Sequence, residues 1–283
     1  WWGVPHPSSG AWEVTEPVAL SGSSLEALLS CPRRWFLSRR AGAERGRASW
    51  ASLGDVMHLL AQHAVTDRLT ADQMRDKLDQ IWAGLVFEAE YQAHSERVEI
   101  DRAVERFSVW HERNPNRVLG VEQPFQVRLT VASRQVLLHG VVDRLELDQD
   151  GRLRIVDFKT GAGKPSDRNL TGMIQLGIYQ LAAGLGAFDD LAPGVREVAP
   201  PILVLLRHGA AEPLCYQQAS LDESPALSEE ALEVGPTWVH DRIAQALRIL
   251  ESGTFDATEC EACRYCAFAS SCPAKIGTGG AVR

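Results

Sequence analysis

The chain lacks a long apolar run, a secretory leader and an excess of basic residues. No apolar stretch approaches the roughly 20 residues that span a bilayer, and no charged-then-apolar start indicates export. We therefore expect a cytoplasmic protein. Its 283 residues are 45% hydrophobic and 23% charged, which is ordinary for a soluble chain with a substantial core. The first residue is Trp1 rather than Met, so we expect a piece of a longer polypeptide.

A net charge of −8 excludes a surface coated with nucleic-acid-binding residues, but a local basic track is still possible. One such track occupies the segment "RRWFLSRRAGAERGR". Its arginines are Arg33, Arg34, Arg39, Arg40, Arg45 and Arg47. Contacts with DNA phosphates, above all by Arg33 and Arg34, and a solvated arginine-rich surface are the two interpretations of this segment.

The chain also lacks a nucleotide-binding loop of the Walker type. The segment "TGAGKPS" (160–166) is a poor match, because Phe158 occupies the place of the first glycine and Pro165 follows the lysine. The chain alone therefore cannot be an ATP-driven motor.

Hydrophobic periodicity predicts an α+β or mixed α/β fold without internal repeats. A capping box at Ser23 and Glu26 predicts a first helix that ends before Pro32. Thr70 and Gln73 predict the start of another helix. The expected helices are 23–30, 50–65, 71–90, 96–113, 170–185 and 236–253, and the expected strands are 118–130, 134–148, 152–160 and 201–207.

The second and third strands form a hairpin around "DQDG" (148–151). A three-residue loop with Gly151 in the left-handed conformation is a common closure, and it pairs residues whose numbers sum to 300. Asp143 then faces Asp157, with Cβ atoms about 4.5–5.5 Å apart. A two-residue loop would shift this register by one. The apolar parity favours the three-residue loop.

Two charges in "LRIVDFKTG", Asp157 and Lys159, share a strand face with Leu153 and Ile155. Burying a charge costs several kcal/mol unless it is paired. A divalent cation would turn the repulsion between Asp143 and Asp157 into attraction. Metal-bound carboxylates beside a lysine suit phosphodiester hydrolysis. The alternative is a solvated or Lys159-paired acidic cluster at a strand end.

These motifs resemble the RecB-type branch of the PD-(D/E)xK nuclease superfamily. "GVVDRLEL" and "RLRIVDFKTG" are similar to its Asp…Asp-x-Lys core, "GDVMH" to its Gly-x-x-x-His helix and "QLGIY" to its Gln-x-x-x-Tyr helix. The resemblance implies a restriction-endonuclease-like core, in which helices flank a central mixed sheet. The Mg²⁺ or Mn²⁺ ligands would be His58, Asp143, Asp157 and the Phe158 carbonyl. The catalytic residues would be Asp143, Asp157, Lys159, Gln175 and Tyr179. "VEQPFQV" is similar to the preceding strand, in which Glu122 has a more variable role.

Six cysteines without an export signal indicate thiols or metal ligands rather than disulfides. "CEACRYCAFASSC" contains Cys263-x2-Cys266-x5-Cys272, which resembles the iron–sulfur motif of a subset of these nucleases. That resemblance implies a [4Fe-4S] cluster that takes Cys31 as its fourth ligand and joins the two ends of the chain. Cys260 is the alternative fourth ligand, and zinc is the alternative metal.

The whole pattern is most similar to the C-terminal nuclease domains of actinobacterial helicase–nuclease subunits of the AdnB type. This resemblance implies a bacterial nuclease that cuts single-stranded DNA during break resection, with helicase motor domains and an AdnA-type subunit as partners. The alternatives are a free-standing RecB-type exonuclease, a CRISPR-adaptation nuclease and a DNA-end-binding clamp. We expect one nuclease domain over 1–283. Its parts are a lead-in (1–20), a helical part (21–66), a helical insertion (67–117), a catalytic core (118–206) and a helix with the cysteine-rich tail (207–283).

Overall fold

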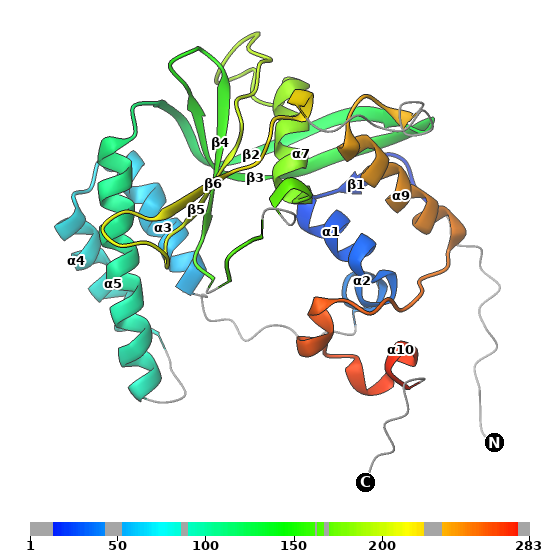
Figure 1. The fold of residues 1–283 in the computed structure, drawn as a ribbon, viewed down its shortest axis with the longest axis horizontal. Coiled ribbons are helices and arrows are strands. Elements are labelled where there is room, and N and C mark those ends of the chain that lie inside the picture. Colours follow the sequence, from blue (N-terminus) through cyan, green and yellow to red (C-terminus); the bar gives the residue numbers. More distant parts are fainter. Residues whose placement is uncertain are drawn as a thin grey trace. The chain divides into compact units, whose positions relative to one another are not determined.

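The computed structural model describes residues 14–42, 53–85, 90–161, 163–166, 170–223 and 234–276 (Figure 1). Its backbone clusters into two compact units built from segments far apart in the sequence. Unit 1 holds the described parts of 1–45, 128–137 and 227–283, and unit 2 those of 46–127 and 138–226. Arg45 and Arg47 lie outside the described residues. The subdivision expected from the sequence stays a prediction.

A mixed sheet runs through the fold and confirms the expected class. Its strands are β1 (Val18–Leu20), β2 (Arg117–Val131), β3 (Arg134–Leu147), β4 (Leu153–Lys159), β5 (Ile202–Leu205) and β6 (Leu214–Gln217). The order is β1-β3-β4-β5-β6, and β2 pairs with β3. The strands β4 and β5 are parallel, whereas β3–β4 and β5–β6 are antiparallel. The short strands β1 and β6 are absent from the sequence prediction.

The β3–β4 hairpin has the predicted register. Leu145 pairs with Ile155 and Leu147 pairs with Leu153. Gly151 closes the loop with φ of +80°, the left-handed conformation that the three-residue loop requires. This register brings Asp143 opposite Asp157 just beyond the last paired position.

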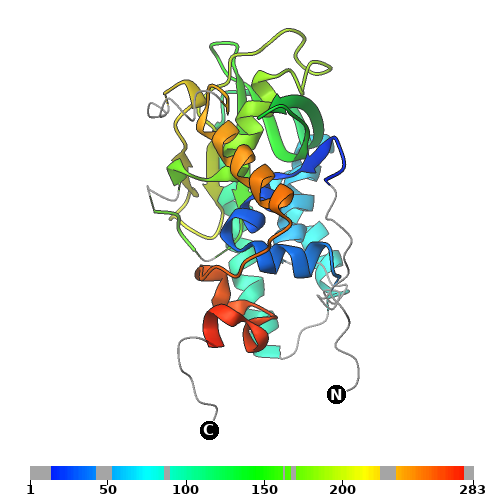
Figure 2. The ribbon, with the colours of Figure 1, turned by 90° about the vertical axis from the view of Figure 1, so that its right-hand side faces the viewer.

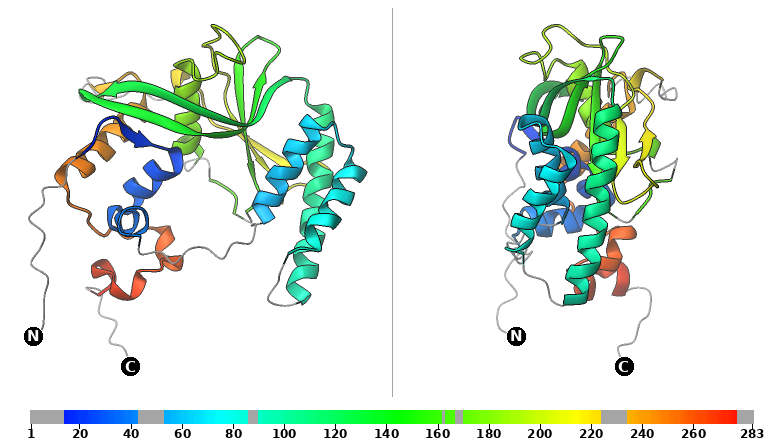
Figure 3. Two further views of the ribbon diagram at one scale, coloured as in Figure 1. Left: turned by 180° about the vertical axis from the view of Figure 1, so that it is seen from behind. Right: turned by 90° about the vertical axis from the view of Figure 1, so that its left-hand side faces the viewer.

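Three helices of unit 2 pack against one another, namely α3 (Leu53–Thr66), α4 (Ala71–Trp82) and α5 (Glu90–Arg113). Thr70 and Gln73 form the predicted capping box of α4. However, α4 ends at Trp82 rather than at residue 90, and α5 begins at Glu90 rather than at 96. Figure 3 shows these helices from behind and from the side.

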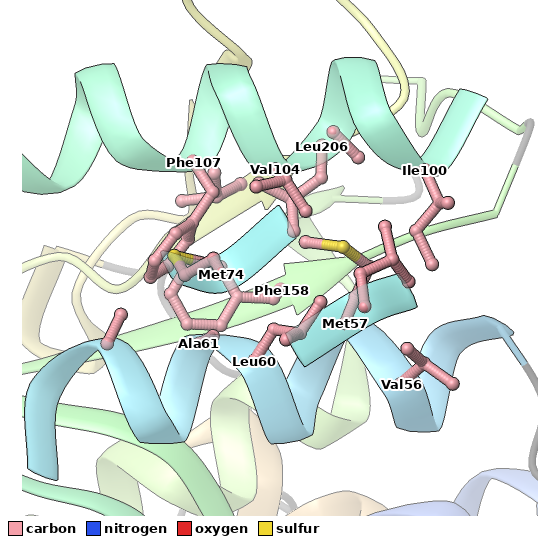
Figure 4. Close-up of a cluster of buried hydrophobic side chains, with 14 of the residues drawn as sticks. Val56, Met57, Leu60, Ala61, Met74, Ile100, Val104, Phe107, Phe158 and Leu206 are labelled. Atoms are coloured by element: carbon pink, nitrogen blue, oxygen red, sulfur yellow. The ribbon is translucent and has the colours of Figure 1, made fainter. Parts of the chain in front are cut away.

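The apolar faces of these helices form a core with one face of the sheet. Leu60, Met74 and Phe107 meet Phe158 of β4 in this core, and Leu206, just after β5, joins them (Figure 4). Side chains alternate along a strand, so Asp157 and Lys159 point to the opposite face. The helix α7 (Ile174–Gly184) packs against β4 there. Its predicted range was 170–185.

The first helices of unit 1 correct one prediction and confirm another. Helix α1 (Gly22–Ser30) is capped by the Ser21 hydroxyl, which accepts a hydrogen bond from the Ser24 N–H, so the N-cap is not Ser23. Helix α1 ends at Ser30, before Pro32, as predicted. A second helix, which the sequence did not predict, begins at once, and Pro32 is the first residue of this α2 (Pro32–Arg39). Proline suits a first helical position, where its missing N–H is not needed. Cys31 therefore lies at a helix–helix corner.

The C-terminal segments of unit 1 fold back onto its first helices. Helix α9 (Trp238–Ser252) packs against α1, and the tail then passes α2 (Figure 2). The Phe255 ring stacks on Phe36 and Trp35 at centroid distances of 4.7 and 5.8 Å, and the Arg33 N–H donates to the Asp256 carbonyl. The short helices η2 (Glu261–Tyr265), η3 (Ala269–Ser271) and α10 (Pro273–Ile276) carry the cysteine-rich sequence.

Candidate active site

Asp157 is a buried carboxylate without enough partners. It lies near the end of β4 and is 0% exposed. Its Oδ2 forms an ion pair with Lys159 Nζ at 2.8 Å, but neither this oxygen nor the buried Oδ1 has a hydrogen bond of good geometry among the described residues. Burial raises the pKa of Asp157, and the Lys159 charge opposes that rise only in part. An orphaned acceptor at this depth costs about 1–3 kcal/mol unless a ligand satisfies it.

Asp143 comes from the facing strand and shares this environment. The Phe158 N–H donates to its Oδ2 at 2.7 Å. Burial, and next the charge of Asp157, raise the pKa of Asp143 to about 7. In the absence of a cation, the two carboxylates therefore oppose each other's ionisation. A bound cation would remove that penalty.

His58 of α3 brings a nitrogen ligand to the same place. Its Nδ1 lies 3.1 Å from Glu122 Oε1 and 3.6 Å from Asp143 Oδ1. Burial alone would lower the pKa of His58, but the hydrogen bond to Glu122 and the charge of Asp143 outweigh it and raise that pKa. The ligand atoms of His58, Glu122 and Asp143 lie within 4.8 Å of one another. No other set of three His, Cys, Asp or Glu residues in the described part of the chain does so.

Glu122 belongs to this group, although the sequence pattern predicted no ligand or catalytic role for it. It adopts φ of +44° in the middle of β2, a conformation that is uncommon for a residue with a side chain. Its carboxylate reaches His58 from there. The only sequence signal was its resemblance to a family position of variable role.

Lys159, Gln175 and Tyr179 form a chain of side chains beside the carboxylates. Lys159 Nζ donates to Gln175 Oε1 at 3.1 Å, and Gln175 Nε2 donates to the Tyr179 hydroxyl at 2.8 Å. The Tyr179 hydroxyl donates to the Val141 carbonyl at 2.8 Å. Gln175 and Tyr179 lie four residues apart on one face of α7, as expected. Burial raises the pKa of Tyr179, so the phenol stays protonated.

The donor set fits a hard divalent cation. Carboxylate oxygens are the preferred ligands of Mg²⁺ and Mn²⁺, and imidazole is an acceptable addition. The orphaned Oδ1 of Asp157 and the raised pKa of Asp143 both fit a site whose carboxylates take a cation as their partner. Phe158 uses its N–H to hold Asp143. Its carbonyl as a metal ligand stays a prediction.

Comparison with known proteins places this geometry in a family. The family model described as "PD-(D/E)XK nuclease superfamily" matches residues 19–273. The chain belongs to the PD-(D/E)XK nuclease superfamily. Members of this superfamily are nucleases that use divalent metals, in agreement with the His58, Glu122 and Asp143 group.

Other comparisons add little to the assignment. One similar solved structure is titled "Crystal structure of SSO0001"; it has 15% sequence identity and a TM-score of 0.42, and the match covers 93% of this chain and 89% of that one. At that similarity it carries no argument. No curated protein matches the chain. In the described part of this nuclease-family chain, no helix is long and apolar enough to cross a membrane.

The cysteines named from the sequence all lie in unit 1. Cys31 is buried at the α1–α2 corner, and those of the tail are half-buried thiols. The Sγ atoms of Cys260 and Cys263 are 4.0 Å apart. Burial, then the hydrogen bond to Cys263 and a weaker influence of Cys31, raise the pKa of Cys260. In the described residues three or more of these thiols do not converge within 4.8 Å, and the cluster with Cys31 as its fourth ligand stays a prediction.

The predicted DNA-contacting arginines of this nuclease-family chain differ in exposure. Arg33 is exposed and Arg34 is half-buried on α2. Further along, the Arg40 guanidinium lies 5.6 Å from the centroid of the Trp35 ring. A DNA-binding role for Arg33 and Arg34 stays a prediction.

Proposed function

We propose that this chain hydrolyses DNA phosphodiester bonds with Mg²⁺ or Mn²⁺. The observation that carries the proposal is the orphaned Oδ1 of Asp157, fully buried opposite Asp143 and beside Lys159. A structural ion pair would have its acceptors satisfied by protein donors. Membership of a nuclease superfamily supports the same conclusion.

Each residue of the site would have a distinct task. His58 and Asp143 would hold the cation, with Glu122 within reach, and Asp157 would be the further ligand that the motif resemblance implies. The bound cation would lower the pKa of a water molecule and neutralise phosphate charge. Lys159 keeps its ammonium at the edge of the site through Asp157 and Gln175, where it can orient the attacking water or stabilise developing negative charge.

The finer proposal is a nuclease domain of the AdnB type. It would cut single-stranded DNA delivered by helicase motor domains, within a complex that has an AdnA-type partner. Exposed Arg33, in the arginine-rich segment of α2, supports a strand-binding role for unit 1. Motif resemblance remains the main support for the helicase context.

In the same proposal, Cys31, Cys263, Cys266 and Cys272 hold a [4Fe-4S] cluster. Its support is the return of the tail to the helix that follows Cys31, where the Arg33 N–H donates to the Asp256 carbonyl. Zinc is the alternative metal for these thiolates. With Zn–S bonds of about 2.3 Å, a tetrahedral zinc site would require sulfurs within about 3.8 Å of one another. Cys260 lies beside Cys263 and is the alternative fourth ligand.

The decisive experiment is digestion of single-stranded DNA by anaerobically purified protein with Mg²⁺, Mn²⁺ or EDTA. Lys159→Ala should slow cutting about 10²- to 10³-fold, as loss of a charge-stabilising donor does. Asp150→Asn is the matched control, because this hairpin-loop aspartate is exposed and paired only with Arg152. Tight binding without cutting under any metal would instead indicate a DNA clamp.

A further inference from the structure

The hydrogen-bonded chain from Lys159 to Val141 assigns a role to Gln175 and Tyr179. We propose that these two residues do not touch the DNA or the attacking water, and that they position Lys159 by tying its ammonium to the backbone of β3. This inference rests on the proposed nuclease function. It differs from the sequence prediction, in which both residues belong to the catalytic group.

The hydrogen bonds all run in one direction. Lys159 can only donate, so it requires the carbonyl oxygen of Gln175. That choice turns the Gln175 amide nitrogen toward Tyr179, whose oxygen accepts from it. The Tyr179 O–H is then free to donate to the Val141 carbonyl, which ends the chain. A flipped Gln175 amide would face the ammonium with its NH₂ group, so the chain permits one orientation.

Burial prevents Tyr179 from reaching a substrate. Tyr179 is 5% exposed, and its ring packs edge-on against Phe125 at a centroid distance of 5.7 Å. Its hydroxyl already donates one hydrogen bond and accepts another. A phenol with both capacities used inside the fold cannot also bind a phosphate.

Lys159 needs this support because its side chain is flexible and 39% exposed. A free lysine side chain loses rotamer entropy when it is fixed in one place, so a second anchor is needed to hold it there. Its ammonium forms an ion pair with Asp157 and donates a hydrogen bond to Gln175, and these two contacts fix its direction at the edge of the site. The anchor, Val141, precedes the ligand Asp143 by two residues on β3. The same short stretch of β3 therefore positions both the Lys159 ammonium and the metal ligand Asp143.

The kinetic test uses Tyr179→Phe and Gln175→Met. We expect the single-turnover cutting rate to fall about tenfold in Tyr179→Phe and about 100-fold in Gln175→Met, the range seen for residues that orient a reacting group. DNA affinity, measured with Ca²⁺ to prevent cutting, should be unchanged. Tyr91→Phe is the matched control, since Tyr91 is 81% exposed. In the Gln175→Met background, Tyr179→Phe should cost less than twofold, because the chain is already broken.

A second measurement does not require activity. The chain has four lysines, Lys77, Lys159, Lys164 and Lys275. Limited acetylation followed by mass spectrometry gives the reactivity of Lys159 relative to the exposed Lys164. Both variants should raise that ratio at least threefold, because a released ammonium is more accessible.

The two measurements separate the possible failures. A wild-type protein that cuts nothing would overturn the proposed function, yet a raised acetylation ratio would still support the positioning of Lys159. An unchanged ratio would overturn the positioning role. So would a Tyr179→Phe variant that binds DNA more weakly, or that loses the same factor with and without Gln175.

Discussion

Two groups of buried charges lie on β3 of unit 2, and they are completed in different ways. Arg144 and Glu146 are 1% and 0% exposed, and they point to one face of the strand. Asp143 points to the other face, toward Asp157. Both groups bear the desolvation cost of charges inside a fold.

In the first group, donors from the protein satisfy both carboxylate oxygens of Glu146. Glu146 Oε1 accepts from Arg144 Nε at 2.6 Å and from Asn114 at 2.6 Å, and its Oε2 accepts from Asn116 at 2.8 Å. Arg144 also donates to His111 Nδ1 at 2.8 Å and lies over the Trp110 ring. We call these residues, Trp110, His111, Asn114, Asn116, Arg144 and Glu146, the closed network.

The group formed by Asp143 and Asp157 is open by comparison. Asp157 Oδ1 has no donor among the described residues, and the neighbouring Asp143 holds its proton up to a pH of about 7. A fold that can surround Glu146 with three donors could do the same for Asp157. The difference between the two groups is thus a mark of function: the closed network stabilises the fold, and the open one keeps its ligand positions for something from outside.

The largest effect should come from removing the open carboxylate. Asp157→Asn keeps the shape but deletes a charge that no protein donor balances completely. We expect DNA cutting to fall at least about 10³-fold, while the metal-free protein gains about 1–3 kcal/mol of unfolding free energy. Activity assays and urea unfolding in EDTA would measure both. Retained Mn²⁺-dependent cutting would contradict the metal-site assignment.

The closed network should respond in the opposite way. Arg144→Leu leaves Glu146 as a buried charge without its counter-ion, which costs about 3–5 kcal/mol of unfolding free energy. The folded fraction should cut DNA at a normal rate with a normal metal requirement. Urea unfolding would measure the loss of unfolding free energy, with Arg248→Leu as the exposed control. The cutting rate would be measured per folded molecule, after titration of the active fraction. A specific loss of metal affinity would show that the two groups are not separate.

Much of this geometry was predictable from local rules. The β3–β4 register followed from loop chemistry at Gly151 and from apolar parity, both of which act within about ten residues. The same holds for the α4 capping box at Thr70. Ser21, rather than Ser23, caps α1 because three nearby serines compete, and the backbone path decides among them. The short strands β1 and β6 contain too few residues to show periodicity.

Long-range features were not predictable. Charged Arg144 and Glu146 alternate with apolar residues, a pattern typical of a solvated strand face, yet α5 and the short connection that follows it bury them. Glu122 reaches His58 only because of its positive φ. Nothing in "VEQPF" signals that conformation. The identity of the site residues came from motifs, whereas their hydrogen-bond partners come from tertiary contacts.

The two groups should also differ in pH dependence. The pKa of Asp143 is raised from 3.8 to about 7, so the stability that this group contributes is present below pH 4 and lost as the pH rises to 7. The pKa of His111 is lowered, first by burial and then by Arg144, so its contribution is lost as the pH falls below 6.5. Asp143→Asn should therefore stabilise the metal-free protein by about 2–3 kcal/mol at pH 8 and hardly at all at pH 4.5. Thermal unfolding in EDTA across this range tests it. A difference independent of pH would contradict the assignment.

The smallest effect should come from opening the closed network by a single donor. Asn116→Ala removes the hydrogen bond to Glu146 Oε2 and leaves a buried acceptor in the condition of Asp157 Oδ1. We expect a loss of about 1–2 kcal/mol in unfolding free energy, with Gln149→Ala in the exposed hairpin loop as the control. Addition of Mg²⁺ should not restore stability, because only one carboxylate is present. If Mg²⁺ did restore it, an orphaned acceptor alone would be enough to bind a cation. The candidate site would then owe its selectivity to its converging ligands His58, Glu122 and Asp143 less than the comparison implies.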